Sequence, residues 1–373
     1  MHYETFSMPL SELDGLEAEW VELATSTSAS AWNWPGWYTA WQSAFSSAEP
    51  LLAYGARSGG RLAALGVFRR RGLRLQAAAN VHSPWFGLLA EDAPAREAVL
   101  GAMLDDRPQE IELRHLMGGG EDERAFLRAA AARRYRVLRT HVEEVPYVSV
   151  GSDWEAYARR KPGRKLIRNV GRLRRRLSEL GAVSFEWLSP DPTTVEELLA
   201  DGLRVERSGW KERSGSAIAM SPSLTLFYGD AARWAAERGW LRLGFLRLDG
   251  RAIAFDYGFE KDGVISLLKG GYDESFASLA PGILLLHDEM LRAFTERAGE
   301  VDLLGECEPY KLRWADGIRP RVTLAAFAPT PAGRTAFALR WLELRARGAA
   351  LRAVPPAARQ RRRRVVPEAS KKL

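Results

Sequence analysis

The order of apolar and polar positions defines one unit clearly, between residues 263 and 314. Residues 264–272 are short, apolar and end in a glycine pair, which is typical of a strand buried in a sheet. Residues 281–294 repeat apolar side chains at helical spacing and open with a proline, which suits a first helical turn. Residues 301–304 predict a second strand, which a right-handed crossover would place beside the first. The pattern therefore predicts a strand–helix–strand unit.

The same kind of pattern predicts alternating groups of strands and helices along the rest of the chain. Two Asp-Gly pairs, at 249–250 and 262–263, lie between apolar runs and predict hairpin turns of an antiparallel meander. The predicted strands lie at 51–57, 61–69, 73–78, 110–113, 145–150, 183–187, 241–248, 251–260 and 323–327. Residues 1–50 predict helix, loop and helix, and further helices are predicted at 93–104, 124–133, 154–180, 193–208, 223–238 and 335–351.

Candidate catalytic and binding groups cluster near the start of the helix predicted over residues 281–294. Its start would lie at the carboxyl ends of the two strands, and free N–H groups there attract a pyrophosphate or carboxylate. The second strand leads into Glu306, Glu308, Tyr310 and Lys311. A bound thioester or ester would then lie near two carboxylates, a phenol and an ammonium group. An ordinary βαβ unit with a polar exit loop fits the same residues.

A strongly basic helix is predicted over residues 154–180. Its apolar stripe indicates one buried side, and the other side carries many cations. Like charges along a helix repel, so an anion such as a phosphate, a nucleotide or a tRNA backbone would stabilise this face. A solvated face is the alternative. The cations are Arg159, Arg160, Lys161, Arg164, Lys165, Arg168, Arg172, Arg174, Arg175 and Arg176.

Composition limits the architecture and the compartment. A length of 373 residues favours two domains, and a hydrophobic fraction of 46% with 13 Trp allows sizeable cores. The single cysteine excludes an internal disulfide and fits a reducing compartment. No apolar run approaches the roughly 18 residues of a membrane span, and residues 1–7 lack the features of a signal peptide. The expectation is a cytoplasmic protein.

The basic charge is concentrated at the carboxyl end. Residues 328–373 contain ten Arg and two Lys against two Glu, a net charge of +10, whereas the whole chain carries +7. Residues 1–327 therefore carry −3, which argues against a body built to bind nucleic acid. The tail leaves open a contact with RNA or with an anionic membrane, at whose inner face the protein would then be peripheral.

Several segments, in this order along the chain, resemble the CelD-like branch of GNAT acyltransferases, which is related to the FemAB aminoacyl transferases. The similarity spans about residues 20–327 and rests on Trp41, 51–75, 83–85, 165–176, 210–213, 281–284 and 302–314. It implies an α/β (α+β) fold of two GNAT-like halves, each a mixed, mostly antiparallel sheet flanked by helices. The expected parts are a degenerate half at 1–150, an acyltransferase half at 151–327, and a basic helix with a disordered tail at 328–373.

The resemblance implies N-acyl transfer from a thioester or an aminoacyl ester to an amine. Such a reaction needs a base, a donor for the oxyanion and an acid for the leaving group. Lys311 matches a lysine of Fem-type proteins and is the expected electrostatic stabiliser. Glu306 or Glu308 is the expected base, with Asp256 third, and Tyr310 is an acid or an orienting group.

Acetyl-CoA or another acyl-CoA is the expected co-substrate, without a metal. The residues expected to bind it are Leu268, Ser278, Ala280, Pro281, Gly282 and Ile283, and those expected to bind substrate are Arg168, Arg172, Trp210 and Lys211. The loop before Pro281 lacks the spaced glycines of the GNAT pyrophosphate signature. Aminoacyl-tRNA therefore stays open as the donor.

Three functions follow as hypotheses. The first is acyl-CoA-dependent acylation of a small or sugar-linked amine, in cell-envelope or exopolysaccharide metabolism. The second is tRNA-dependent aminoacyl transfer of the FemAB type. The third is an accessory protein that has kept the fold without catalysis. Cys307 is a poor candidate nucleophile, because glutamates flank it and a thiolate needs a basic setting.

Overall fold

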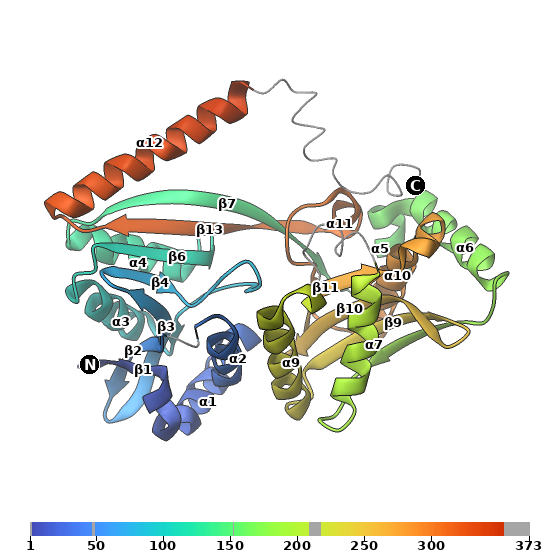
Figure 1. Ribbon diagram of the computed structural model, residues 1–373, viewed down its shortest axis with the longest axis horizontal. Helices are drawn as coiled ribbons and strands as arrows, with labels where there is room; N and C mark the ends of the chain where they lie inside the picture. Colours follow the sequence, from blue (N-terminus) through green and yellow to red (C-terminus); the bar gives the residue numbers. More distant parts are fainter. Residues whose placement is uncertain (1, 47–48, 152, 209–217, 354–373) are drawn as a thin grey trace. The chain divides into compact units, whose positions relative to one another are not determined.

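The computed structural model describes residues 2–46, 49–151, 153–208 and 218–353, so the predicted substrate residues Trp210 and Lys211 lie outside the described part. The described chain forms two compact units (Figure 1). Unit 1 contains residues 2–143 and 319–353, and unit 2 contains residues 144–318. Each unit has a sheet with helices against it, and the mixed α/β class expected from the sequence is confirmed.

The sheet of unit 1 contains the three strands predicted between residues 51 and 78, which are confirmed as β2, β3 and β4. The pattern did not predict β1, which pairs antiparallel with β2. Phe6 explains why β1 fits there: its ring lies where a side chain at Gly55 would project, so the glycine makes room for it. The strands, in sheet order, are β1 (Glu4–Pro9), β2 (Leu51–Ser58), β3 (Arg61–Arg71), β4 (Arg74–Ala77), β6 (Glu110–Met117) and β13 (Gly317–Phe327), with β5 (Leu89–Ala90) against β3.

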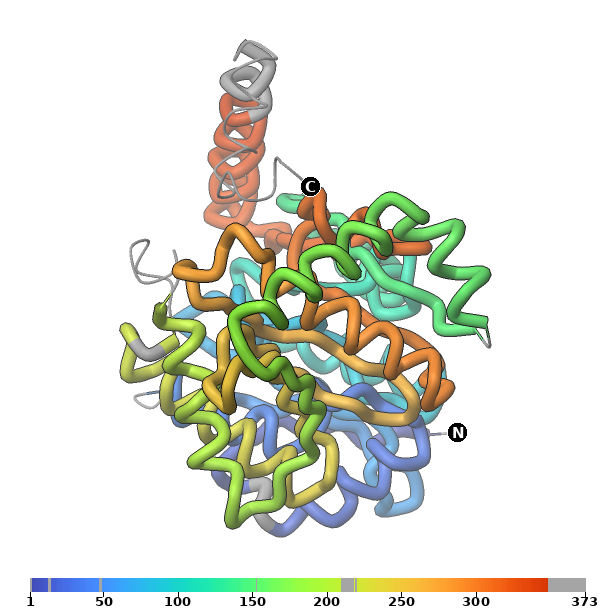
Figure 2. Tube along the Cα trace, turned by 90° about the vertical axis from the view of Figure 1, so that its right-hand side faces the viewer, coloured from blue at the N-terminus to red at the C-terminus, as the bar shows by residue number. Residues whose placement is uncertain are grey.

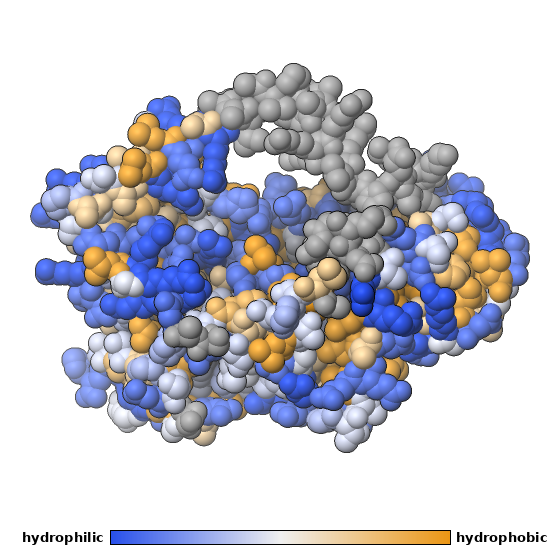
Figure 3. Space-filling model, viewed as in Figure 1, coloured by the Kyte–Doolittle hydropathy of each residue, from blue (hydrophilic) through white to orange (hydrophobic). Residues whose placement is uncertain are grey.

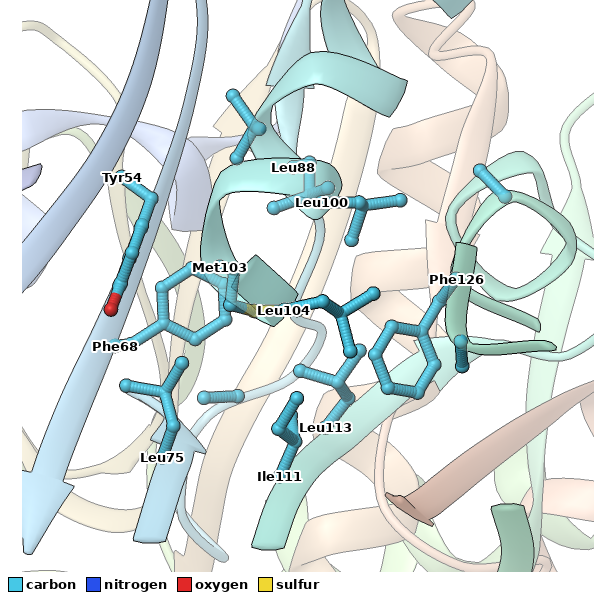
Figure 4. Close-up of a cluster of buried hydrophobic side chains, with 14 of the residues drawn as sticks. Tyr54, Phe68, Leu75, Leu88, Leu100, Met103, Leu104, Ile111, Leu113 and Phe126 are labelled. Atoms are coloured by element: carbon cyan, nitrogen blue, oxygen red, sulfur yellow. The ribbon is translucent and has the colours of Figure 1, made fainter. Parts of the chain in front are cut away.

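The core of unit 1 lies between its sheet and α3 (Ala93–Asp105) and α4 (Glu121–Ala132) (Figure 4). Residues 31–45 form a short 3-10 helix and α2 (Pro35–Phe45), and the aromatic side chains of Trp34, Tyr38 and Trp41 there are buried. The remaining helices are α1 (Glu17–Ser26) and α12 (Pro331–Ala353). Apolar side chains lie exposed on α12 (Figure 3), among them Leu339 and Leu342.

The sheet of unit 2 is mostly antiparallel, and it contains the predicted strand–helix–strand unit. Its order is β7 (Arg136–Ser149), β12 (Glu300–Asp302), β11 (Val264–Tyr272), β10 (Arg251–Lys261), β9 (Leu241–Leu248) and β8 (Val183–Leu188), with β7 entering from unit 1 along the chain. Only the β11–β12 pairing is parallel among these described neighbours. Both Asp-Gly turns are confirmed: Asp249, Gly250, Asp262 and Gly263 have positive φ, as hairpin turns require.

Helices cover both faces of this sheet (Figure 2). α6 (Arg164–Ser178) and α10 (Pro281–Thr295) share a core with β9 and β10. α7 (Val195–Arg207) and α9 (Pro222–Glu237) lie on the opposite face, where the ring of Phe255 occupies the space beside Gly202 and Tyr257 packs on Tyr228. Short 3-10 helices lie at Ile218–Met220 and Glu274–Leu279.

Two predicted elements of unit 2 were wrong. The single helix expected over 154–180 is broken: α5 (Trp154–Ala158) passes through a π-helical turn, Arg159–Gly163, into α6. Gly163 has φ +88°, and Lys161 is extended before Pro162, so the break is local. The polar exit after the second strand is also helical, as α11 (Pro309–Trp314), which Pro309 opens at its first position.

Candidate active site

The two parallel strands of unit 2 separate after a short pairing. Their register ends at Ser266 opposite Asp302, while β11 continues to Tyr272. A tight turn carries the chain away from β11: Leu304 and Gly305 have positive φ, and the N–H of Leu304 donates to Asp302 Oδ1 at 3.0 Å. Residues 267–272 of β11 therefore have one edge that β12 does not engage, beside the start of α10.

A carboxylate on β10 faces this region between two glycines. Asp256 pairs in register with Gly244 on β9 and with Gly270 on β11. Residues opposite one another in register lie on the same face of a sheet, so neither neighbour presents a side chain beside Asp256. Oδ1 of Asp256 occupies the space that a Cβ on Gly270 would need. Asp256 is half-buried, and the glycines leave room for its carboxyl group.

The second carboxyl group of the site comes from α10. Glu289 is 4% exposed, and its Oε1 lies against Gly244, in the space that a Cβ there would fill. Gly244 is the register partner of Asp256, so the carboxyl groups of Glu289 and Asp256 lie next to each other on this face of the sheet. Burial, the charge of Asp256 and the charge of Asp288 raise the pKa of Glu289 well above its usual value.

Tyr310 adds a phenol to this pair. It lies in α11, which begins at Pro309, and its side chain packs against the core of unit 2. Burial and the nearby charges of Glu308, Asp256 and Glu289 raise the pKa of Tyr310 well above its usual value. The phenol therefore stays protonated at neutral pH and can donate a hydrogen bond or a proton.

Lys311 contacts its own chain. Its Nζ donates to the carbonyl oxygen of Leu304 at 2.8 Å and lies 2.7 Å from Glu308 Oε2, with the lysine side chain 13% exposed. The ammonium group thus holds the turn that follows β12 against α11. Glu306, in the same loop, is exposed. Cys307 donates to the carbonyl of Glu144, and burial with the nearby acids raises the pKa of its thiol.

The start of α10 offers fewer backbone donors than the sequence suggested. Pro281 has no N–H, and the N–H groups of Ile283 and Leu284 both donate to the carbonyl of Ala280, at 2.9 and 3.2 Å. Ala280 has φ +47°, which turns its carbonyl toward the helix. Gly282 is therefore the first helical residue with an N–H. Ser278 is exposed before this turn, and Leu268 lies where the register of β11 with β10 slips.

The cations of α6 are more compensated than expected. Arg174 pairs with Asp288, and Arg160 of the preceding turn pairs with Asp316. Arg168 and Arg172 are exposed, and Arg172 donates to the side chain of Asn169. Neither contacts the carboxyl pair in the described part of the chain. The apolar side of α6 is buried as predicted, through Leu166, Val170, Leu173 and Leu177.

The structure thus brings together Asp256, Glu308, Tyr310 and Lys311 of the predicted residues. Sequence reasoning missed Glu289, which interrupts the apolar run of α10 immediately after Asp288. Two consecutive acids on a helix that is otherwise apolar were a usable signal, because a buried acid needs a partner. The pattern could not show that Asp288 pairs with Arg174 whereas Glu289 faces Asp256.

A mainly antiparallel sheet that opens between two parallel strands, with a helix starting beside the opening, defines the GNAT type of acyltransferase fold. Residues 164–312, within unit 2, match the family model described as an acetyltransferase (GNAT) domain. No curated protein matches the chain.

Solved structures share this architecture at low sequence identity. FemX is 11% identical, with a TM-score of 0.56 over 90% of this chain and 99% of FemX. L-PGS from Bacillus licheniformis is 14% identical, with a TM-score of 0.51 over 77% of this chain and 86% of that chain. A tandem GNAT protein from the clavulanic acid biosynthesis pathway is 14% identical, with a TM-score of 0.47 over 88% and 99%. The likeness to FemX and to L-PGS, with TM-scores of 0.56 and 0.51, indicates a shared fold.

Two features are absent from residues 2–46, 49–151, 153–208 and 218–353, the part of the chain that the structure describes. No helix there is long and apolar enough to cross a membrane. No group of His, Cys, Asp and Glu side chains in these residues has an arrangement that could hold a metal ion.

Proposed function

We propose that unit 2 is an N-acyltransferase that moves an acyl group from acyl-CoA to an amine. The observation that carries the proposal is the carboxyl pair of Asp256 and Glu289, beside the protonated phenol of Tyr310 and the edge of β11 that β12 does not engage. It lies inside the segment that matches the GNAT domain. A base and an acid at one opening are what acyl transfer to an amine needs.

The proposed chemistry assigns one role to each group. Asp256 accepts the proton of the ammonium group, so that the free amine attacks the thioester carbonyl. The C–N bond forms and the nitrogen releases its second proton to solvent, the C–S bond breaks, and the departing thiolate takes a proton from the Tyr310 phenol. The proton on Asp256 then returns to Tyr310 through solvent. Asp256 is favoured over Glu306 as the base because it is half-buried beside the opening, whereas Glu306 is exposed.

The donor is proposed to lie along residues 267–272 of β11, with its phosphates near the start of α10. Backbone groups of this edge and the N–H of Gly282 supply hydrogen-bonding partners, and Leu268 and Ile283 supply apolar contact. The acceptor is proposed to be a small or sugar-linked amine of cell-envelope or exopolysaccharide metabolism, as the CelD-like resemblance implies.

Binding of CoA compounds tests the proposal first. Acetyl-CoA, longer acyl-CoAs and free CoA are each titrated calorimetrically, and release of the CoA thiol is then followed with a panel of amines. A ligand that binds only the native state raises apparent stability by about 2.7 kcal/mol at a hundredfold excess over its Kd, so thermal unfolding gives a second readout. We expect binding, and thiol release that depends on an amine. The absence of binding by every CoA compound contradicts the proposal.

A second candidate is aminoacyl transfer from charged tRNA. The exposed cations of α6 support it, because Arg164, Lys165, Arg168, Arg175 and Arg176 have no ion pair in the described part of the chain. The small number of free N–H groups at the start of α10 also favours a donor other than a pyrophosphate. A charged tRNA mixture should then bind with an affinity that falls steeply with salt, and label should pass from tRNA to an amine. If neither donor is used, a non-catalytic accessory role remains.

A further inference from the structure

The contact between Asp256 and Glu289 has a requirement of its own. A carboxylate only accepts hydrogen bonds, so a hydrogen bond between two carboxyl groups needs a proton on one of them. Both carboxyl oxygens of Glu289 are buried beside Asp256, and neither has a hydrogen-bond partner among the described residues. Burying two adjacent carboxylates without a cation would cost far more than keeping one of them neutral.

Among the described residues, the groups that face Glu289 carry no positive charge that would balance a carboxylate there. β10 presents Asp256, whose negative charge disfavours a second one, and α11 presents Tyr310, whose protonated phenol carries no charge. On α10 itself, Asp288 is the adjacent acid, and its charge is matched by Arg174. β9 presents Gly244 and β8 presents Trp187, neither of which is charged.

We propose that Asp256 and Glu289 share one proton at neutral pH, that the proton resides on Glu289, and that Glu289 thereby acts as a positioning residue for the Asp256 carboxylate. Exposure decides which member keeps the charge: Asp256 is half-buried and Glu289 is 4% exposed, so the charge lies on the better solvated group. The proposal of a shared proton does not depend on the proposed transferase reaction. The positioning role rests on that reaction.

Infrared spectroscopy tests where the proton is. A protonated carboxyl group has a C=O stretch that a carboxylate lacks, so the difference spectrum between wild type and Glu289→Gln at neutral pH isolates this residue. Glu123→Gln is the matched control, since Glu123 is also buried but is bound by Arg139 and by the N–H of Gly119. We expect the band to disappear in Glu289→Gln and to persist in Glu123→Gln. A band that persists in Glu289→Gln overturns the assignment.

Stability against pH gives a second readout that needs no substrate. The native state holds a proton that the unfolded chain releases above about pH 4.3, so the stability of unit 2 falls as pH rises from there. Glu289→Gln removes this dependence. Hydrogen exchange in peptides covering β10 and α10 should therefore be slower in Glu289→Gln than in wild type at about pH 8, and nearly equal at about pH 4. An equal difference at both pH values contradicts a shared proton.

The positioning role is tested by comparing two variants in the transfer assay. Glutamine keeps an N–H donor next to Asp256, whereas alanine removes it. We expect Glu289→Gln to retain a transfer rate at least about tenfold above that of Glu289→Ala, with similar KM, because the carboxylate stays fixed. Equal losses in the two variants would refute the positioning role. If the wild-type protein transfers nothing from any donor, that result contradicts the proposed function. It does not affect the infrared test of the shared proton.

Discussion

Arg174 on α6 donates to both carboxylate oxygens of Asp288 on α10, at 2.5 Å each. Asp288 is 8% exposed, so this contact ties the basic helix to the helix that carries Glu289. It also explains why the two adjacent acids of α10 differ: Asp288 has a cation, and Glu289 has a second carboxyl group.

Loss of this pair should destabilise unit 2. Arg174→Ala leaves the carboxylate of Asp288 buried with His287 as its remaining partner in the described chain, at a cost of about 1–3 kcal/mol. Arg175→Ala is the control, because Arg175 is exposed and its substitution removes no ion pair within the described residues. The free energy of unfolding should therefore change by no more than about 0.5 kcal/mol. Urea unfolding measures both. Equal effects would show that the pair contributes nothing.

Asp256 and Glu306 are the two candidates for the general base, and substitution of each distinguishes between them. Asp256→Asn should lower the transfer rate by about 10²–10⁴-fold, which is the usual contribution of a general base. Glu306→Gln should stay close to the wild-type rate, because Glu306 is exposed in the loop before α11. Thiol release under saturating acyl-CoA measures both variants. The reverse order would return the role of base to Glu306, as the sequence suggested.

Lys311 is expected to matter for the fold as well as for any charge it supplies. Lys311→Met leaves the carbonyl of Leu304, which is 5% exposed, without its donor, and should cost about 1–3 kcal/mol of stability. Lys165→Met, at an exposed position of α6, serves as the control. A stable Lys311→Met protein that no longer transfers would show that its ammonium group acts on the substrate.

The glycines beside Asp256 should resist substitution. A Cβ at position 270 would overlap Oδ1 of Asp256, so Gly270→Ala should displace the carboxylate, slow transfer and cost about 1–3 kcal/mol by overpacking. Gly171→Ala on α6 is the control: no atom lies near the added methyl group, and alanine should stabilise the helix by roughly 0.5–1 kcal/mol. Thermal unfolding of the two proteins should therefore shift in opposite directions.

His115 should make unit 1 sensitive to acid. Burial, followed by the charge of Arg321, lowers the pKa of His115 to about 4, and its Nδ1 donates to the carbonyl of Ser83 at 2.7 Å. In the unfolded chain His115 binds a proton below about pH 6.5, whereas in the native state it stays neutral until about pH 4. The free energy of unfolding is therefore unaffected by this group above about pH 6.5 and decreases by up to about 3 kcal/mol as the pH falls toward about 4.

Substitution at this position tests the sign. His115→Asn, which tolerates the residue's φ of +61°, should remove this part of the acid sensitivity. His141→Asn, at an exposed histidine, should keep it. Unfolding midpoints measured from neutral pH down to about pH 4 distinguish these outcomes. Equal slopes in both variants would show that another group is responsible.

The sequence by itself determined the elements that depend on neighbouring residues. Asp249-Gly250 and Asp262-Gly263 could form hairpin turns wherever the strands lay, because their backbone preference is local. Pro281 and the apolar spacing after it were enough to place α10, and the stripe from Leu166 to Leu177 was enough to give α6 a buried side. The mixed α/β class follows from the order of these elements.

Tertiary structure decided everything that depends on register and on distant partners. β1 forms because Phe6 fits over Gly55, and β13 groups with unit 1 from residue 319 onward, neither of which a local pattern contains. The site depends on the same kind of relationship: Asp256 has room because two strands place glycines beside it. Glu289 meets it because α10 crosses that face of the sheet, and burial beside a second carboxyl group raises the pKa of Glu289.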